Sequence, residues 1–128
     1  MPTGLQFRQA HFPGRAPVDS YGNGGFRFAE MSHRGSILCL PSGIYGWSAV
    51  TPADLTVESF EQVMKEEDIE VLLVGTGTDL LPLSAVLKEA LAARGIASDP
   101  MSTGAAARTF NVLLGEGRAV AAALLAVE

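Results

Sequence analysis

A short segment rich in glycine and threonine, Gly75-Thr76-Gly77-Thr78, has residue types that could bind an anion. It follows an apolar run that ends at Val74, and we expect Pro82 in the first turn of the next helix. Backbone amides between a buried strand and a helix N-terminus can cradle an anion, and the helix dipole assists them. The segment is no dinucleotide fingerprint, because Leu80 stands where the third glycine belongs, and no lysine follows it as in a P-loop. We therefore favour the alternative, a tight turn that needs small residues.

Arg108 and Asn111 form the second candidate site, because residues three apart share one face of a helix. An arginine fork can hold a carboxylate or a phosphate with two hydrogen bonds, and small residues precede Arg108. If Arg108 and the Gly75–Thr78 loop serve one anion site, they must lie close together at a pocket. The alternative, which we favour, is a structural pair between Arg108 and a nearby acid. Asn111 lies in an otherwise apolar helix and needs a partner, so it could tie that helix to a neighbouring loop.

The remaining reactive side chains lack a catalytic pattern. Cys39 lies within an apolar strand and is expected to be an inert core residue. His11 and His33 have no acid or nucleophile at a triad spacing. We expect no catalytic residue, no metal site and no cofactor. Tyr45 and Trp47 could form a partly exposed aromatic patch for a partner, with core packing as the alternative for Trp47.

The elements around these residues indicate an α/β protein. The run from 69 to 74 predicts a strand buried on both faces, and the pattern over 82–94 predicts a helix that ends at Gly95. We expect the strands near 36–40 and 69–74 to be buried neighbours in one sheet, with the 82–94 helix on its face.

The other expected elements complete the chain. The first fifty residues are β-rich, and their short connections favour antiparallel pairing. The expected elements are an edge strand within 1–17, a hairpin turning at Asn23-Gly24, a turn at His33-Arg34-Gly35, strands at 36–40 and 44–50, a helix after Thr56, a short strand at 96–101 broken by Pro100, a helix over 103–115 capped by Ser102 or Thr103, and a strand within 119–127.

Length and composition narrow the class of protein. The chain has 128 residues, which favours a single domain over 1–128. A formal net charge of −5 argues against a nucleic-acid surface, which needs a basic patch. The longest apolar stretch, 119–127, is too short to span a bilayer, and no signal peptide is recognisable. Cys39 alone allows no intramolecular disulfide, so we expect a cytoplasmic protein.

Several motifs together resemble the family called domain of unknown function 498, which includes mitochondrial respiratory complex I assembly factor 3. The resemblance rests on four parts of the chain: the segment 19–26, Leu40-Pro41-Ser42-Gly43 with Trp47, the segment 74–77, and the segment 103–124. Two departures concern the last segment, where Ala107 and Phe110 replace the cysteine and tyrosine of the family pattern. Thiol or phenol chemistry from that helix therefore has no support here.

The resemblance implies a single α/β domain with a mixed central sheet, helices packed on it and a β-rich N-terminal layer. It also implies that no enzymatic activity is established for the family, whose eukaryotic members bind other proteins while a membrane complex assembles. The leading hypothesis is a bacterial, non-enzymatic interaction or assembly protein that binds a protein partner near membrane complexes. The alternative is a small-molecule or anion-binding protein, or an enzyme, that uses the Gly75–Thr78 loop with Arg108. The sequence gives neither the partner nor the oligomeric state.

Overall fold

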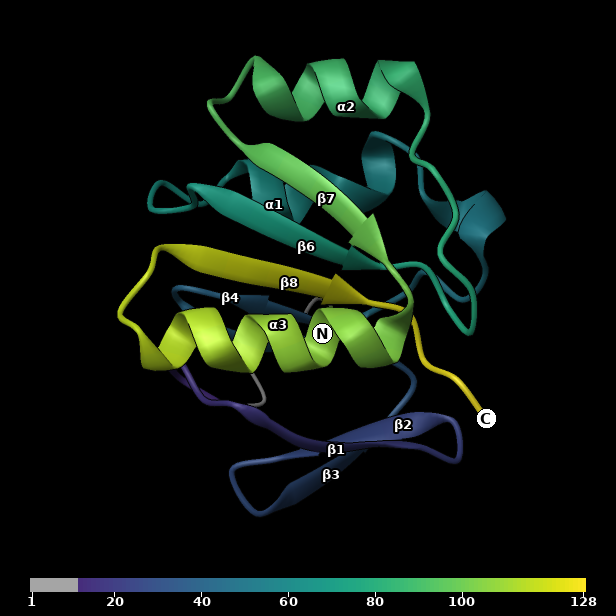
Figure 1. The fold of residues 1–128 in the computed structure, drawn as a ribbon, viewed down its shortest axis with the longest axis vertical. Coiled ribbons are helices and arrows are strands. Elements are labelled where there is room, and N and C mark those ends of the chain that lie inside the picture. Colours follow the sequence, from purple (N-terminus) through teal and green to yellow (C-terminus); the bar gives the residue numbers. More distant parts are fainter. Residues whose placement is uncertain (1–11) are drawn as a thin grey trace, which may run out of the picture.

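A five-stranded mixed sheet forms the middle layer of the computed structural model, which describes residues 12–128 (Figure 1). Its order is β5-β4-β8-β6-β7. The strands are β4 (Ser36–Leu40), β5 (Gly43–Trp47), β6 (Val71–Gly75), β7 (Ala97–Met101) and β8 (Val120–Leu124). β6 is parallel to β7 and β8, whereas β4 is antiparallel to β5 and β8. The predicted mixed sheet is confirmed, but the prediction that 36–40 and 69–74 are neighbours is wrong because β8 lies between them.

Alternate residues of the central strands point into two separate cores. On β6, Leu72 and Val74 belong to one buried cluster, and Leu73 belongs to the other. On β8, Ala121 and Ala122 divide between the clusters in the same way. Since both faces are covered, these strands are continuous apolar runs rather than alternating ones, as the sequence indicated for 69–74.

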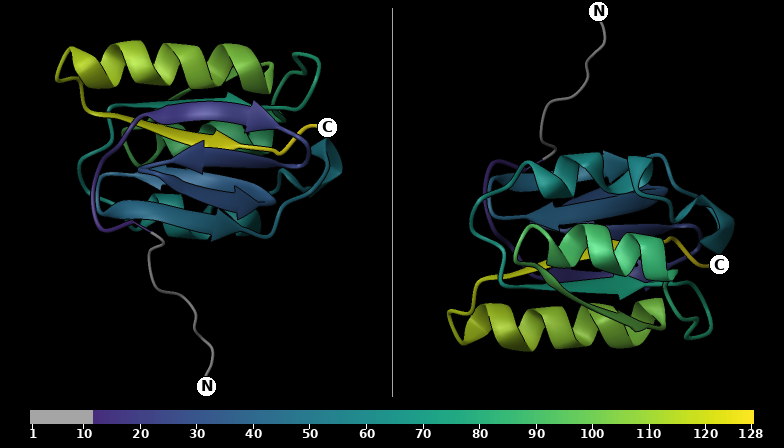
Figure 2. Two further views of the ribbon diagram at one scale, coloured as in Figure 1. Left: turned by 90° about the horizontal axis from the view of Figure 1, so that it is seen from below. Right: turned by 90° about the horizontal axis from the view of Figure 1, so that it is seen from above.

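The crossover connections place helices on opposite faces of the sheet. The chain runs from β6 through α2 (Ala85–Ala92) to its neighbour β7, and then returns through α3 (Thr103–Gly115) past β6 to β8. Because both connections favour the right hand and their directions are opposite, α2 and α3 cover different faces (Figures 1 and 2).

One face is covered by α2 together with the short elements η2 (Glu58–Phe60) and α1 (Glu61–Met64), and the exposed turn η1 (Pro52–Asp54) precedes them. The helix predicted after Thr56 is present as η2 and α1. The predicted start of α2 is wrong, because Ser84 is its N-cap and accepts a 3.2 Å hydrogen bond from the amide of Leu87. Its predicted end is confirmed. Gly95 has a φ of 78°, and the next amide bonds back to Leu91, as in a Schellman motif.

The other face is covered by α3 and a three-stranded antiparallel sheet that lie side by side (Figure 2). This sheet contains β1 (Val18–Gly22), β2 (Gly25–Phe28) and β3 (Met31–Arg34). It is the predicted β-rich N-terminal layer, and its first turn is at Asn23-Gly24 as predicted. β3 was not predicted. It occupies most of the expected turn at 33–35, and Gly35, with a φ of 98°, makes the corner into β4.

Two further predictions concern edge strands. β7 continues through Pro100, contrary to the predicted break. The amide of Ala97 donates to the carbonyl of Glu70, and the carbonyl of Met101 accepts from the amide of Thr76, so these two residues of β7 direct their backbone groups towards β6. Because directions alternate along a strand, Pro100 faces the open edge of the sheet, where a missing N–H breaks no hydrogen bond of the sheet. The edge strand predicted within 1–17 lies mostly outside the described residues.

Candidate functional site

The Gly75–Thr78 loop is held to β7 and to α3 by hydrogen bonds. The amide of Thr76 donates to Met101 (2.8 Å), and the amide of Gly77 donates to the Thr103 hydroxyl (3.1 Å). That hydroxyl donates in turn to the carbonyl of Leu125 (2.7 Å). The Thr76 hydroxyl accepts from the amide of Leu81 (3.0 Å) and is buried. These amides therefore serve the fold, as a tight turn requires.

Close approach explains one of the loop glycines. A Cβ on Gly75 would lie 2.9 Å from the Cα of Thr103. Thr78 is exposed at the outer end of the segment. Because α2 begins only at Ala85, the Gly75–Thr78 segment does not sit at the N-terminus of the helix that follows it. The sequence suggested that placement through Pro82, which instead precedes the helix.

Asn111 fastens α3 to the small sheet. Its side-chain oxygen accepts from the amide of Val18 (2.9 Å), and its side-chain nitrogen donates to the carbonyl of the same residue (2.8 Å). A helix side chain thus takes the place of a neighbouring strand at the edge of β1. Asn111 therefore ties its helix to another part of the chain, but the partner is strand β1 rather than the expected loop.

Arg108 lies on the surface beside this contact. It is exposed and lines a groove of about 450 Å³ between α3 and β1, together with Asp19, Ser20, Tyr21 and Asn111. Among the described residues no acid forms an ion pair with Arg108. The lining of this groove includes none of the residues Gly75–Thr78. The structure brings Arg108 and Asn111 together with β1, and brings the loop together with Thr103.

The two aromatic residues proposed as a partner patch both pack into or against the buried cluster that contains Phe60 and Val63. Trp47 is 8% exposed, its indole N–H donates to the carbonyl of Ser59 (2.8 Å), and its ring meets Phe60 edge-on at 5.3 Å. Tyr45 is half-buried, and its hydroxyl lies 2.6 Å from the hydroxyl of Ser42. Trp47 is mainly a core residue that shows one edge at the surface.

A contact between Tyr21 and Gly104 has no local signal in the sequence. A Cβ on Gly104 would overlap the Tyr21 hydroxyl, so the glycine lets the ring of Tyr21 lie on α3. The two residues are far apart in the chain, and only the fold shows that a small residue in one segment accommodates an aromatic residue in the other.

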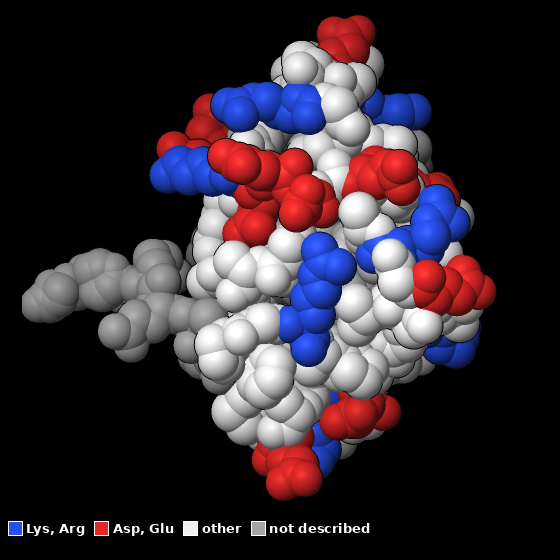
Figure 3. All heavy atoms as spheres, turned by 90° about the vertical axis from the view of Figure 1, so that its left-hand side faces the viewer, with Lys and Arg blue, Asp and Glu red and all other residues white. Residues whose placement is uncertain are grey.

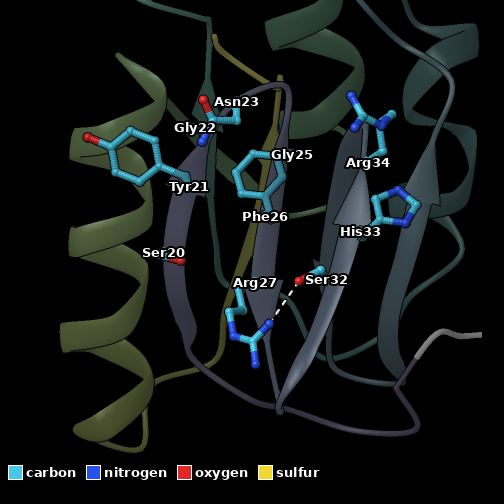
Figure 4. A pocket seen from close by; sticks show the side chains of 10 residues that line it. All are labelled: Ser20, Tyr21, Gly22, Asn23, Gly25, Phe26, Arg27, Ser32, His33 and Arg34. Carbon is cyan, nitrogen blue, oxygen red and sulfur yellow. Dashed lines mark hydrogen bonds between the residues drawn. The ribbon is translucent and has the colours of Figure 1, made fainter.

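The outer face of the small sheet carries a hollow that the sequence did not indicate (Figure 4). It has a volume of about 430 Å³, and the described residues that line it include Arg27 and Arg34 but no carboxylate. Arg27 donates to the hydroxyl of Ser32 (2.9 Å) across the strand pair. A second hollow, of about 560 Å³, lies on the other side of β3 and is lined by Trp47 and Leu38 among others. Arg34 lines both hollows.

Charge elsewhere is mixed. Figure 3 shows acidic and basic side chains interspersed over one face of the molecule, without a continuous basic surface there. This agrees with the net charge of −5. In the described part of the chain, no three histidine, cysteine or acidic residues are grouped as metal ligands would be, and no helix is long and apolar enough to cross a bilayer.

Fold and site together define a small mixed α/β protein in which a three-stranded sheet and one helix share a face of the central sheet. The chain belongs to the family described as "Protein of unknown function (DUF498/DUF598)", whose model matches residues 18–125.

Two relatives of similar sequence extend this result. An uncharacterised protein of Rhodobacter capsulatus is 40% identical over 118 residues, which cover 92% of this chain and 90% of that protein. The NADH dehydrogenase [ubiquinone] 1 alpha subcomplex assembly factor 3 of Mus musculus is 36% identical over 96% of this chain and 67% of the mouse protein.

Solved structures share the fold closely. A protein of Bartonella henselae described as an outer membrane protein has a TM-score of 0.89 and 64% identity, covering 92% of this chain and all (100%) of that one. The NMR structure of a Rhodopseudomonas palustris protein has a TM-score of 0.82 and 43% identity, covering 98% of this chain and 93% of that one.

Proposed function

We propose that this chain is an assembly factor that acts by binding other proteins rather than by catalysis. The observation that carries the proposal is its 36% identity, over 96% of its length, to the mouse assembly factor. In this proposal residues 1–128 act as one domain in the cytoplasm, and the partner belongs to a membrane complex of the NADH dehydrogenase type.

The geometry of the site supports binding over chemistry. Two of the polar side chains that the sequence offered for binding, those of Thr76 and Asn111, are hydrogen-bonded to backbone groups of the fold. Burial raises the pKa of the Cys39 thiol to about 12, which keeps it in its unreactive form. What the molecule offers to a partner is its surface, where two hollows flank β3.

The test is recovery of a defined partner set. The tagged chain is expressed at its native level, crosslinked in cells and purified, and subunits of the NADH dehydrogenase complex are quantified by mass spectrometry. We expect these subunits to be enriched over a control with an unrelated tagged protein of similar size. We also expect cells without the chain to contain less of the assembled complex. No enrichment together with normal amounts of the complex would refute the proposal.

A second candidate function is anion binding in the groove between α3 and β1. It is favoured by one observation, the exposed guanidinium of Arg108 without an ion pair among the described residues. Thermal melts of the wild type and of Arg108→Ala, with and without phosphate, test it. Stabilisation by phosphate that is lost in Arg108→Ala supports this function, and the absence of any phosphate effect refutes it.

A further inference from the structure

β3 and β4 follow each other as one bent strand. Along one edge both are paired, but along the other edge β5 pairs with β4 only. Gly35 alone separates the two strands. On one side, β4 pairs with β8 and β3 pairs with β2, and the amide of Gly24 in the β1–β2 turn bonds to Val127 just beyond β8 (2.8 Å). On the other side, β5 pairs with β4 and ends at Trp47, opposite Ser36. The edge of β3 therefore continues the line along which β5 pairs with β4, and no strand formed by residues 12–128 pairs with β3 at that edge.

The hairpin geometry identifies the backbone groups at this open edge. The turn Ala29-Glu30 is a two-residue loop, so Phe28 and Met31 form the hydrogen-bonded pair next to it. Gly35 also bonds towards β2, through its amide to Gly24 (2.7 Å). Since directions alternate along a strand, Ser32 and Arg34 direct their N–H and C=O groups away from β2. No backbone group of residues 12–128 bonds to Ser32 or Arg34 on that side.

The two hollows flank this edge and differ in chemistry. The outer one presents Arg27 and Arg34, both exposed, and none of the described residues in its lining carries a carboxylate (Figure 4). The inner one is lined by the largely buried side chains of Leu38 and Trp47, and by polar residues that include Arg34, Glu58 and Glu61. Those acidic residues, Glu58 and Glu61, would repel an acidic side chain placed in the inner hollow.

A strand added to β3 would place successive side chains alternately in these two hollows. We propose that the open edge of β3 binds an extended segment of a partner protein in which acidic and apolar residues alternate. The acidic residues lie beside Arg27 and Arg34, and the apolar residues lie against Leu38 and Trp47. Backbone bonds to Ser32 and Arg34 give affinity and the two hollows give specificity, as in other cases of strand addition. This inference rests on the proposed function and names the chemistry of the partner.

A synthetic peptide tests the inference directly. The probe is a seven-residue peptide of alternating valine and glutamate, with acetylated and amidated ends, titrated into the ¹⁵N-labelled chain and followed by NMR. We expect saturable shifts at the amides of Ser32, Arg34 and Trp47, and none on α2. A peptide with lysine in place of glutamate should bind at least about fivefold more weakly, because its charges oppose the two arginines.

Three variants separate the contributions. Arg34→Glu should weaken binding about fivefold to tenfold, whereas Lys88→Glu, the matched charge reversal on α2, should leave it unchanged. Ser32→Pro removes one outward N–H and should also weaken binding, since β2 does not use that group. The spectrum of each free variant shows whether it is folded, and Arg34→Glu alone decides if Ser32→Pro does not fold.

Several results would overturn the inference. The first is the absence of any amide shift at millimolar peptide. The second is equal affinity for the lysine and glutamate peptides, and the third is a set of shifts confined to the groove between α3 and β1. Concentration-dependent shifts at Ser32 and Arg34 without peptide, with a doubled mass in sedimentation, would instead show an interface between two copies of the chain. If tagged Arg34→Glu still recovers NADH dehydrogenase subunits as the wild type does, this site is refuted and the assembly function stands. If the wild type recovers none, the assembly function itself fails, whatever the peptide does.

Discussion

Asn111 shows how much one side chain can contribute at the boundary between a helix and a sheet. Replacing it with alanine leaves both the N–H and the C=O of Val18 without their partners. We expect Asn111→Ala to lower the free energy of unfolding by about 1–3 kcal/mol. Urea denaturation measures this loss. Arg108→Ala, on the same helix face, is the matched control and should stay within about 0.5 kcal/mol of the wild type. Equal stability of the two variants would show that the hydrogen bonds of Asn111 to Val18 do not stabilise the fold.

Cys39 provides a probe of the core at the residue scale. Burial raises the pKa of its thiol to about 12, so at pH 8 the thiolate is a fraction on the order of 10⁻⁴. We expect Cys39 of the native protein to react with a thiol reagent such as DTNB only when unfolding exposes the thiol. The rate should therefore rise with urea in parallel with unfolding. Fast labelling of the folded protein without urea would contradict this burial.

At the scale of elements, the two hairpin turns of the small sheet differ in quality. Asn23 and Gly24 suit the left-handed conformation of their turn, but Ala29 and Glu30 adopt it as well, with φ of 48° and 65°. We expect the double change Ala29→Asn, Glu30→Gly to stabilise the protein by about 1 kcal/mol. The converse change Asn23→Ala should destabilise it. Thermal and urea unfolding measure both, and a loss of stability in the double variant would contradict the argument.

The same turns show which elements the sequence could predict. Local signals were sufficient for the Asn23-Gly24 turn, for α3 with its Ser102 cap and for the end of α2 at Gly95. The turn at Ala29-Glu30 carries no such signal, so β3 was missed. The break predicted at Pro100 is wrong, because a proline interrupts a strand only where its missing N–H would have bonded to a neighbouring strand. Whether it would have depends on which strand forms the edge of the sheet, and the local sequence does not show this.

At the scale of the whole molecule, the doubly buried sheet makes one substitution decisive. The side chain of Leu72 is 0% exposed within the sheet core. An unpaired carboxylate there costs several kcal/mol, against a total stability of about 5–15 kcal/mol. We expect Leu72→Asp to be unfolded by circular dichroism. Val86→Asp, at an exposed position of α2, should fold normally. A cooperative melt of Leu72→Asp near that of the wild type would contradict the placement of β6.

The candidate site could be predicted only in part, because it depends on contacts between distant segments. Asn111 was recognised as a polar residue that needs a partner, but nothing local identified Val18 as that partner. The loop at Gly75–Thr78 was recognised as a tight turn, but its bond to Thr103 depends on how α3 lies. Nothing in the sequence marks Arg27 and Arg34 as residues of one site, since a hollow on the face of a sheet exists only after its strands have paired.

The central place of β8 has a consequence for biosynthesis. β8 joins β4 to β6, yet it follows every other strand in the order of the chain. During translation, the β4–β5 hairpin and the β6–α2–β7 unit emerge first and cannot pair with each other. A ribosome-bound chain that stops before β8 therefore exposes two unpaired apolar strand edges at once. Resistance of such chains to protease should appear only after residues 120–124 have left the ribosome, and in a single step.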